Sequence, residues 1–328
     1  MSTTLTRPRP SLRGPVRVVV RQHRWTLWAA AALMALVVVV LVVTRLLTDR
    51  SVDLFAATGC STAKTLQGCD GTARSYLDDQ HMLHAIQVYA GVVMLALPLL
   101  VGIFAAGPLI ARELETGTYR LAWSQSVSPA RWLAAKLAVP AVLLTAGVCV
   151  LSAAFTWARA RTGGEYEDEW FDGPVFATMG AVPVGYVLLG LTAGTLTGLL
   201  IRRTVPAMAV GALAVGAVLV TLGSIRSSLW PLRTLTGTLH SAGDPWVLEV
   251  GQVTAGGQRL PVDTCWGPEM NKAEEARCVA DHGITGPFFD YHPASHFWPL
   301  QLVETGLLLA LAALALALAF RVLRRRTG

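Results

Sequence analysis

Six apolar runs, each long enough to cross a lipid bilayer as a helix, constrain this chain more than any other feature of its sequence. A helix of about 20 residues is about 30 Å long, which matches the hydrocarbon core of a membrane. With 53% hydrophobic and only 15% charged residues, the chain is too apolar for a soluble globular protein. The sequence therefore predicts an all-α, multi-pass membrane protein. The six predicted transmembrane helices cover residues 25–44, 85–110, 133–157, 175–201, 205–222 and 297–320.

The polar segments between these runs predict the domain organisation. Residues 1–24 form a tail with six arginines and no acid, and its last part has the spacing of an amphipathic helix on the membrane surface. Residues 25–222 hold the first five spans and the polar segment 111–136. Residues 223–296 are the largest polar segment, and residues 297–328 contain the last span and a second basic tail.

Charge predicts the orientation, because six spans place both termini on the same side of the membrane. The segments on that side are the two tails, residues 111–136 and the Arg202-Arg203 turn, and they contain 16 basic and two acidic residues. The segments on the other side contain 11 basic and 18 acidic residues. Since Lys and Arg accumulate in cytoplasmic segments, both termini are predicted to be cytoplasmic, in a cell membrane. The net charge of +6 does not indicate nucleic-acid binding, because the basic residues flank the spans.

Four of the five cysteines lie in segments predicted to be outside the cytoplasm, where disulfides persist. Three pairings of these four are possible. The local pairs, Cys60 with Cys69 and Cys265 with Cys278, are favoured because each closes a short loop within one segment. Pairing between the two loops stays open as the alternative. The fifth cysteine, Cys149, is predicted to be a small buried apolar residue of the third span.

The polar segment 111–136 must lie at the membrane surface, because ionised side chains and unpaired backbone groups are costly in hydrocarbon. It combines two acids, a glycine-threonine break, a tryptophan and a serine-proline helix start. This composition is typical of a surface that contacts another protein. The residues concerned are Glu113, Glu115, Gly117, Thr118, Trp123, Ser128, Pro129 and Arg131.

Two features inside the predicted spans carry separate expectations. Gly190, Gly194 and Gly198 follow one another at intervals of four residues, which predicts a face that lets another helix approach closely. Glu304 lies about two turns into the last span, where an ionised carboxylate is costly unless it is paired or hydrated. Its role in a substrate path and its role in pairing two helices stay open as alternatives.

The search for catalytic chemistry gives a largely negative result. The three lysines, Lys64, Lys136 and Lys272, all lack the glycine-rich context of a phosphate-binding loop, so the chain is predicted to have no ATPase site. His81 and His84 could share a metal ion on one helix face, but a hydrated helix start is the simpler interpretation. We expect no catalytic residue, cofactor or metal in this chain.

Three motifs, together with the six spans, carry a resemblance to a known family. They are the segment 111–136, the turn RRTVPA at residues 202–207, and the stretch YHPASHFWPLQ at residues 291–301 with ETG at residues 304–306. These motifs resemble ABC type-2 (ABC-2) exporter permeases of high-GC Gram-positive, or actinobacterial, type. Segment 223–296 is longer than in minimal members of that family.

The resemblance implies an exporter built from two copies of the permease and two separate ATPase subunits, which bind ATP and Mg. It would export a small molecule, a drug or a lipid-like substrate. In this family a coupling helix in the first cytoplasmic loop touches the ATPase. On this basis the contact candidates are Glu113, Glu115, Gly117, Thr118, Trp123 and Arg131. As the alternative, Glu113 and Arg131 only pair with each other.

Two other classes of function stay open. A non-transporting sensor or scaffold could display residues 223–296 outside the cell, but it would leave the segment 111–136 without a role. A secondary transporter would be expected to carry several ionisable residues in its spans or inverted repeats, whereas Glu304 is the single acid found in a predicted span.

Overall fold

A computed structural model of the chain describes residues 24–62, 68–100, 106–118, 128–160, 169–238, 244–268 and 270–327. The predicted surface helix of the basic tail and Trp123 therefore lie outside the described residues. Within these ranges, six helices are long and apolar enough to cross a membrane, as the sequence predicts. They are α2 (Arg24–Ala57), α3 (Asp70–Leu100), α6 (Pro129–Arg159), α8 (Val182–Ile201), α9 (Thr204–Ile225) and α11 (Phe297–Thr327).

One of the predicted spans is interrupted. The run 175–201 divides into α7 (Gly173–Thr178) and α8, and Gly180 between them has a left-handed φ of 67°. Hydropathy alone does not reveal such a break, because the residues on both sides remain apolar. Of the run 85–110, α3 covers the first part, and a short helix α4 (Gly107–Thr116), which has a proline in its first turn, begins in the last part.

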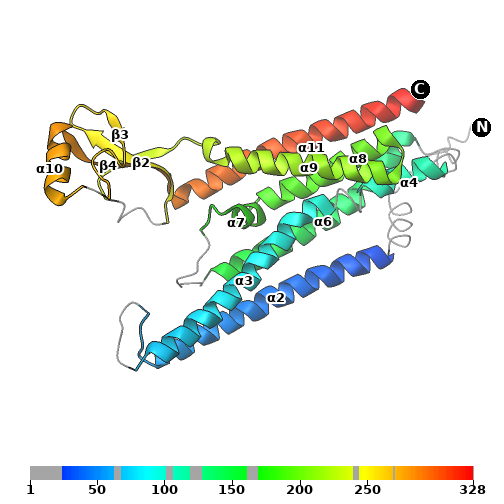
Figure 1. The fold of residues 1–328 in the computed structure, drawn as a ribbon. Coiled ribbons are helices and arrows are strands. Elements are labelled where there is room, and N and C mark those ends of the chain that lie inside the picture. Colours follow the sequence, from blue (N-terminus) through cyan, green and yellow to red (C-terminus); the bar gives the residue numbers. More distant parts are fainter. Residues whose placement is uncertain are drawn as a thin grey trace, which may run out of the picture.

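The helices form a bundle with two distinct ends (Figure 1). At the terminal end, α2 begins, α11 ends and α4 lies against the bundle; at the sheet end, the chain forms a small β-domain. Helix α8 is the most deeply buried span. The Cβ of an alanine at Gly198 would lie 3.2 Å from the carbonyl oxygen of Gly107, so α8 and α4 nearly touch through their backbones there. Gly190 and Gly194 are also buried in α8.

Three apolar clusters hold the bundle together. The first joins α4, α6, α8 and α11 at the terminal end, through side chains such as Ile110 and Leu199. The second joins α7, α8, α9 and α11 at the sheet end, around Phe176 and Leu308. The third joins α2, α3 and α6, around Leu41. Helix α6 belongs to both the first and the third cluster, so it links α2 and α3 to α8 and α11.

Helices α2 and α3 form a long hairpin whose tip is closed by a disulfide. With 34 and 31 residues they exceed the roughly 20 that a bilayer core requires. Phe55 stacks on Tyr76 with 4.1 Å between ring centroids, and the Cys60–Cys69 disulfide joins the chain on either side of the tip. This is the local pairing that the sequence favours. The hairpin therefore continues beyond the apolar part of both helices.

Residues 233–292 correct the expectation of an all-α protein. Four strands form an antiparallel sheet in the order β1-β4-β2-β3. The two long strands read WVLEVGQVT and ITGPFFDYH, and their β-branched and aromatic residues favour a pleated sheet. The strands are β1 (Arg233–Thr236), β2 (Trp246–Thr254), β3 (Arg259–Pro261) and β4 (Ile284–His292), with α10 (Lys272–Asp281) between the last two.

A disulfide and a helix cap complete the β-domain. Asn271 and Glu274 form a reciprocal capping box that starts α10. Cys278 on α10 is bonded to Cys265, which is the second local pairing favoured by the sequence. The prediction for Cys149 is wrong, because its side chain is exposed on the surface of α6. A thiol is apolar enough to face lipid, so the hydropathy of that position could not distinguish the two environments.

Aromatic side chains attach the β-domain to the bundle. Trp246 of β2 stacks on Phe171 with 5.3 Å between centroids and meets Trp170 edge-on at 6.0 Å. The indole N–H of Trp170 donates to the carbonyl oxygen of Asp244, at 2.8 Å. Trp170 also contacts Phe297, the first residue of α11, edge-on. The sheet is thus packed directly on the start of the last span.

Replacement of Gly251 in β2 is expected to unfold the sheet locally. An alanine Cβ there would lie 2.4 Å from the ring of Phe288 and 2.6 Å from the carbonyl oxygen of Leu260. Such overpacking costs about 1 to 3 kcal/mol. Gly251→Ala should therefore lower the temperature at which protease cleaves the β-domain of the full-length chain. Gly256→Ala is the control, since its Cβ would meet only Thr254 Oγ1 at 3.8 Å; equal melting of both variants would contradict the packing.

Candidate functional site

The segment that the sequence marks as a protein-contact surface begins with α4 at the terminal end. Pro108 lies in the first turn of this helix, where its missing N–H costs no hydrogen bond. Ile110 and Ala111 are buried against the bundle, which leaves Arg112 exposed on the opposite face. Gly117 ends the helix with a left-handed φ of 72°, which a residue with a side chain rarely adopts. The acids Glu113 and Glu115 lie in the last turns.

Glu113 joins α4 to α6. Its carboxylate forms an ion pair with the ammonium group of Lys136, and both side chains are largely shielded from solvent. The same ammonium group lies 5.1 Å from the centroid of the Trp132 ring. The alternative pairing of Glu113 with Arg131 is not observed, because Arg131 lies at the exposed start of α6. There its backbone N–H donates to the hydroxyl of Ser128, which caps the helix.

Glu115 joins α4 to the turn between α8 and α9. Its Oε2 accepts hydrogen bonds from the hydroxyl and the backbone N–H of Thr204, at 2.7 and 3.1 Å. These bonds lower the pKa of the Glu115 carboxyl below its ordinary value. The stabilisation that these bonds give to the contact between α4 and α9 is therefore fully present at pH values above the ordinary pKa of the carboxyl. It is lost as the pH falls through the lowered pKa of Glu115. At neutral pH, α4 and the start of α9 are tied together.

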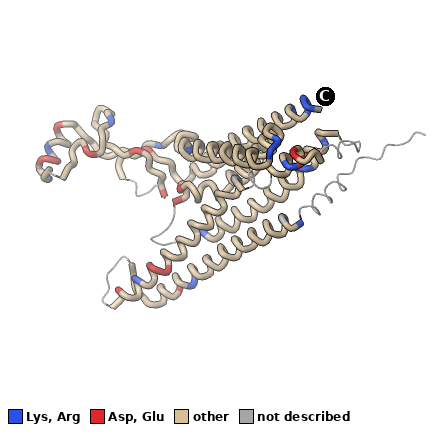
Figure 2. The backbone as a smooth tube through the Cα atoms, turned by 45° about the vertical axis from the view of Figure 1, so that its right-hand side comes forward, with Lys and Arg blue, Asp and Glu red and all other residues tan. Residues whose placement is uncertain are grey.

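The turn beside Glu115 carries exposed positive charge. Arg202 has a left-handed φ of 58° and ends α8, and Arg203 follows it at the surface. Arg326 of α11 donates to the carbonyl oxygen of Leu199 at 2.5 Å, which satisfies a carbonyl at the end of α8. Figure 2 shows the basic residues gathered at this end of the bundle. The exposed residues of this surface are Arg112, Glu115, Thr116, Thr118, Arg131, Arg202 and Arg203.

At the sheet end, Glu304 is completely buried and paired. Its two carboxylate oxygens accept from the guanidinium of Arg226, at 2.9 and 3.3 Å, and the hydroxyl of Tyr186 donates to Oε1 at 3.0 Å. The guanidinium also lies over the ring of Phe176, 4.2 Å from its centroid. Three spans, α8, α9 and α11, therefore meet at one carboxylate. This geometry is that of a helix-pairing group, the structural alternative that the sequence left open.

Gln301, one turn before Glu304, satisfies the break between α7 and α8. Its amide oxygen accepts from the backbone N–H groups of Ala181 and Val182, both at 3.0 Å, and its amide nitrogen donates to the carbonyl of Phe176 at 2.8 Å. The backbone groups that lack a partner within their own helices are thereby hydrogen-bonded in the bundle interior, where water is scarce. The last span is thus tied to the fourth at two successive turns.

Several polar residues that join the helices were not identified from the sequence, among them Arg226, Gln301 and Arg45. Arg226 follows the fifth span directly, and Gln301 precedes Glu304 by one turn, so their proximity in the fold depends on how the helices pack. Arg45 is buried within α2, where it donates to the carbonyls of Trp157 and Ala158 at the end of α6 and pairs with Asp49 at 2.9 Å. Arg45 directly follows the predicted span 25–44 and is itself followed by two leucines; this continuation of apolar residues past a charge is the signal that could have identified it.

One group of the described residues has the composition of a metal site. Cys265, Cys278 and His282 have their potential ligand atoms within 4.8 Å of one another. However, the two sulfurs are joined in a disulfide, so neither can supply the thiolate that a metal binds.

The buried pair is expected to show strong coupling in a double-mutant cycle. Arg226→Leu or Glu304→Leu alone leaves an unpaired charge in the bundle, which costs about 3 to 5 kcal/mol. The double variant removes both charges and should recover much of this loss. Thermal unfolding of the detergent-solubilised chain measures the effect, with Arg321→Leu, an exposed arginine of α11, as the control. Additive losses in the double variant would show that the two groups are not coupled.

Comparison with known protein families matches residues 31–226 to the model of the family described as ABC-2 membrane transporter related. The match covers α4 and its contacts with α6 and α9, and it ends at Arg226. No curated protein and no solved structure matches the chain.

Proposed function

The chain belongs to the ABC-2 membrane transporter related family, and from this premise we propose that it is the permease subunit of an ATP-binding-cassette exporter. It would couple ATP hydrolysis by a separate ATPase subunit to the export of a small molecule, a drug or a lipid-like substrate. The family match is the observation that carries this proposal. The absence of a phosphate-binding loop from the sequence agrees with it, since the energy must then come from a partner.

The terminal end of the bundle would face the cytoplasm. This orientation is supported by the positive charge of the surface around Arg202 and Arg203, together with the basic ends of α2 and α11 (Figure 2). The two disulfides lie away from this end, at the tip of the α2–α3 hairpin and in the β-domain. That placement suits the oxidising side of a membrane.

The ATPase would dock on the exposed part of α4 and on the neighbouring Arg202-Arg203 turn. Glu113 and Glu115, which the family resemblance lists among the contact candidates, already hold α4 to Lys136 of α6 and to Thr204 of α9. A force on α4 would therefore reach two spans through polar contacts. It would also reach α8, against which α4 packs at Gly198. Such joints allow a partner to shift the balance between two packings of the same helices.

A second copy of the chain would complete the transport path, as the family resemblance implies. We propose a homodimer, since one chain supplies six spans and family members function as pairs. Each copy would contact its own ATPase subunit, and the two copies would be related by two-fold symmetry.

The orientation predicts which cysteines react from outside. In intact cells, a membrane-impermeant maleimide added after mild reduction should label Cys265 and Cys278. A cysteine introduced as Thr118→Cys, at the exposed end of α4, should remain unlabelled. Labelling of position 118 from outside the cell would reverse the proposed topology.

If the chain works with a separate ATPase subunit, ATP hydrolysis is expected only from the complex of the two proteins. The purified chain should hydrolyse no ATP above background, and hydrolysis should appear when the ATPase subunit is co-expressed. Trp123→Ala removes a large aromatic anchor, on the order of 2 kcal/mol for a binding hot spot, and should weaken co-purification. Glu115→Ala frees the Arg202-Arg203 turn from α4 and should lower transport-coupled hydrolysis while the complex still forms.

The matched control is Asp281→Ala, an exposed acid of α10 in the β-domain. It should leave both association and hydrolysis unchanged, because it lies at the opposite end of the molecule. Wild-type association and coupling in both loop variants would mean that residues 111–136 are only a connector, and ATP hydrolysis by the pure chain would refute the assignment altogether.

A further inference from the structure

Two buried histidines lie where the β-domain meets the bundle. His292 is the last residue of β4, and His296 ends the short 3-10 helix η3 (Ala294–His296), which leads directly into α11 (Figure 1). Both side chains are buried. The ring of Trp246 lies 5.3 Å from that of His292, and the ring of Trp230 lies 6.5 Å from that of His296, between centroids. Both histidines belong to the stretch YHPASHFWPLQ, to which the proposed function gives no role.

Hydrogen bonds determine which nitrogens of this pair carry hydrogens. Nε2 of His292 lies 2.9 Å from the carbonyl oxygen of Ser227 and, because a carbonyl can only accept, this nitrogen carries a hydrogen. Nδ1 of His292 lies 2.9 Å from Nδ1 of His296. In neutral His292 that nitrogen has no hydrogen, so Nδ1 of His296 donates to it. The pair therefore links β4 to the start of α11 and to η2 (Arg226–Ser228), which follows α9.

The closed pair can hold one additional proton but not two. If His296 alone is protonated, its Nδ1–H still donates to His292 and the bond remains. If both imidazoles are protonated, both Nδ1 atoms carry hydrogens that face each other across 2.9 Å. The bond is then lost, and two buried positive charges repel each other. Two separated, hydrated histidines can each bind a proton. At low pH the open state therefore binds at least one more proton than the closed state.

The charged groups around the pair do not offset this repulsion. Burial is the main effect that opposes a positive charge on His296, and the guanidinium of Arg233 on β1 adds to it. Two acids of the elements around the pair are already bound to arginines, and two are exposed to solvent. They are Asp290 with Arg259, Glu304 with Arg226, and the exposed Asp244 and Glu249. A paired or hydrated carboxylate gives little stabilisation to a second imidazolium.

From this geometry we propose that His292 and His296 form an acid-sensitive contact between the β-domain and the bundle. The stabilisation that the contact provides is fully present above the ordinary histidine pKa of about 6.5 and declines as the pH falls below it. Each additional proton bound by the open state changes the balance by up to about tenfold per pH unit. In the proposed orientation the pair would respond to the pH outside the cell. Opening would release the end of β4 from Ser227 and from the start of α11.

Hydrogen–deuterium exchange of the full-length chain in phosphatidylcholine nanodiscs tests the contact. After correction for intrinsic exchange, protection of residues 284–296 should fall by about tenfold or more between about pH 7.5 and about pH 5. Protection of α8 should not change. His296→Asn keeps a donor at the Nδ1 position but cannot be protonated. This variant should keep its protection at the higher pH and lose most of the fall, because two positive charges no longer meet.

The matched control is His282→Asn, since His282 is an exposed histidine of the same β-domain. It should retain the fall of the unmodified chain. His292→Gln keeps a donor to Ser227 and removes the other ring, so it decides the outcome if His296→Asn fails to fold. Unchanged protection of the unmodified chain between the two pH values would overturn the proposal, and so would an undiminished fall in both variants of the pair. The measurement uses no ATPase, so its result is independent of the exporter function.

Discussion

The structure depends on how the chain satisfies the backbone groups at its helix ends. Each helix end leaves carbonyl or N–H groups without partners within its own helix, and at a buried end, such as the start of α8, water is scarce. Side chains from other helices supply them: Arg45 binds the end of α6, Arg326 the end of α8, Gln301 the start of α8 and Glu115 the start of α9. Each such bond also fixes one helix relative to another. The same polar residues therefore allow the helices to end and determine how they pack.

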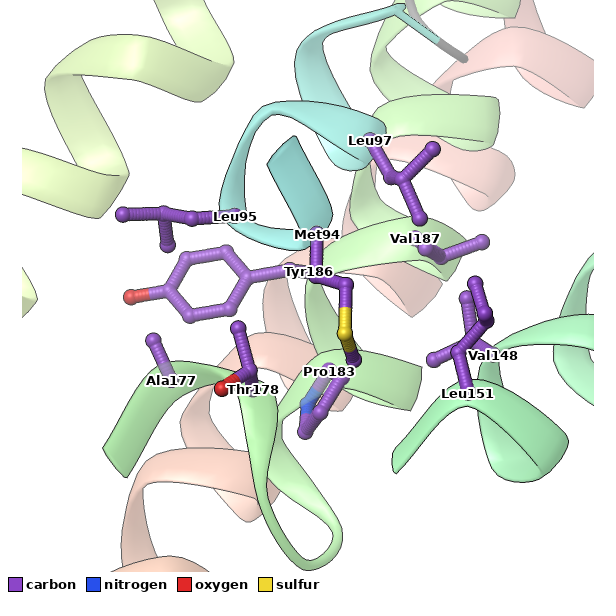
Figure 3. A pocket seen from close by; sticks show the side chains of 10 residues that line it. All are labelled: Met94, Leu95, Leu97, Val148, Leu151, Ala177, Thr178, Pro183, Tyr186 and Val187. Atoms are coloured by element: carbon purple, nitrogen blue, oxygen red, sulfur yellow. The ribbon is translucent and has the colours of Figure 1, made fainter. Parts of the chain in front are cut away.

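This pattern joins the helices by polar contacts at both ends of the bundle. At the terminal end, α4 is bonded to α6 and α9, and at the sheet end, Glu304 joins α8, α9 and α11. Between these contacts, α3 and α6 meet α7 and α8 around a small apolar pocket (Figure 3). Beside it the hydroxyl of Ser152 on α6 donates to the carbonyl oxygen of Gly180, at 3.4 Å, so a polar contact also links the helices in the middle of the bundle.

The sequence predicted what depends on local composition. Hydropathy located all six spans, and the short loops within each segment favoured the two observed disulfides. It did not predict that Glu113 pairs with Lys136 instead of Arg131, because that choice depends on how α4 is rotated against α6. The average composition does not predict the β-domain, because residues 223–296 are polar when taken as one segment. The aromatic and β-branched residues of its two long strands carried a signal that an average over the segment hides.

The buried pair also explains why the last third of the chain cannot be an independent addition to the helical core. The family match ends at Arg226, whereas its partner Glu304 lies outside the matched residues, on α11. Helix α11 also supplies Gln301 to the start of α8, and Leu308 packs at Gly185 so closely that an alanine Cβ would lie 2.9 Å from it. Without α11, the matched part would keep a buried unpaired guanidinium and open helix ends. The β-domain, which is attached to the first residues of α11 by Trp170 and Trp246, is therefore connected to the same structural unit that contains the pocket.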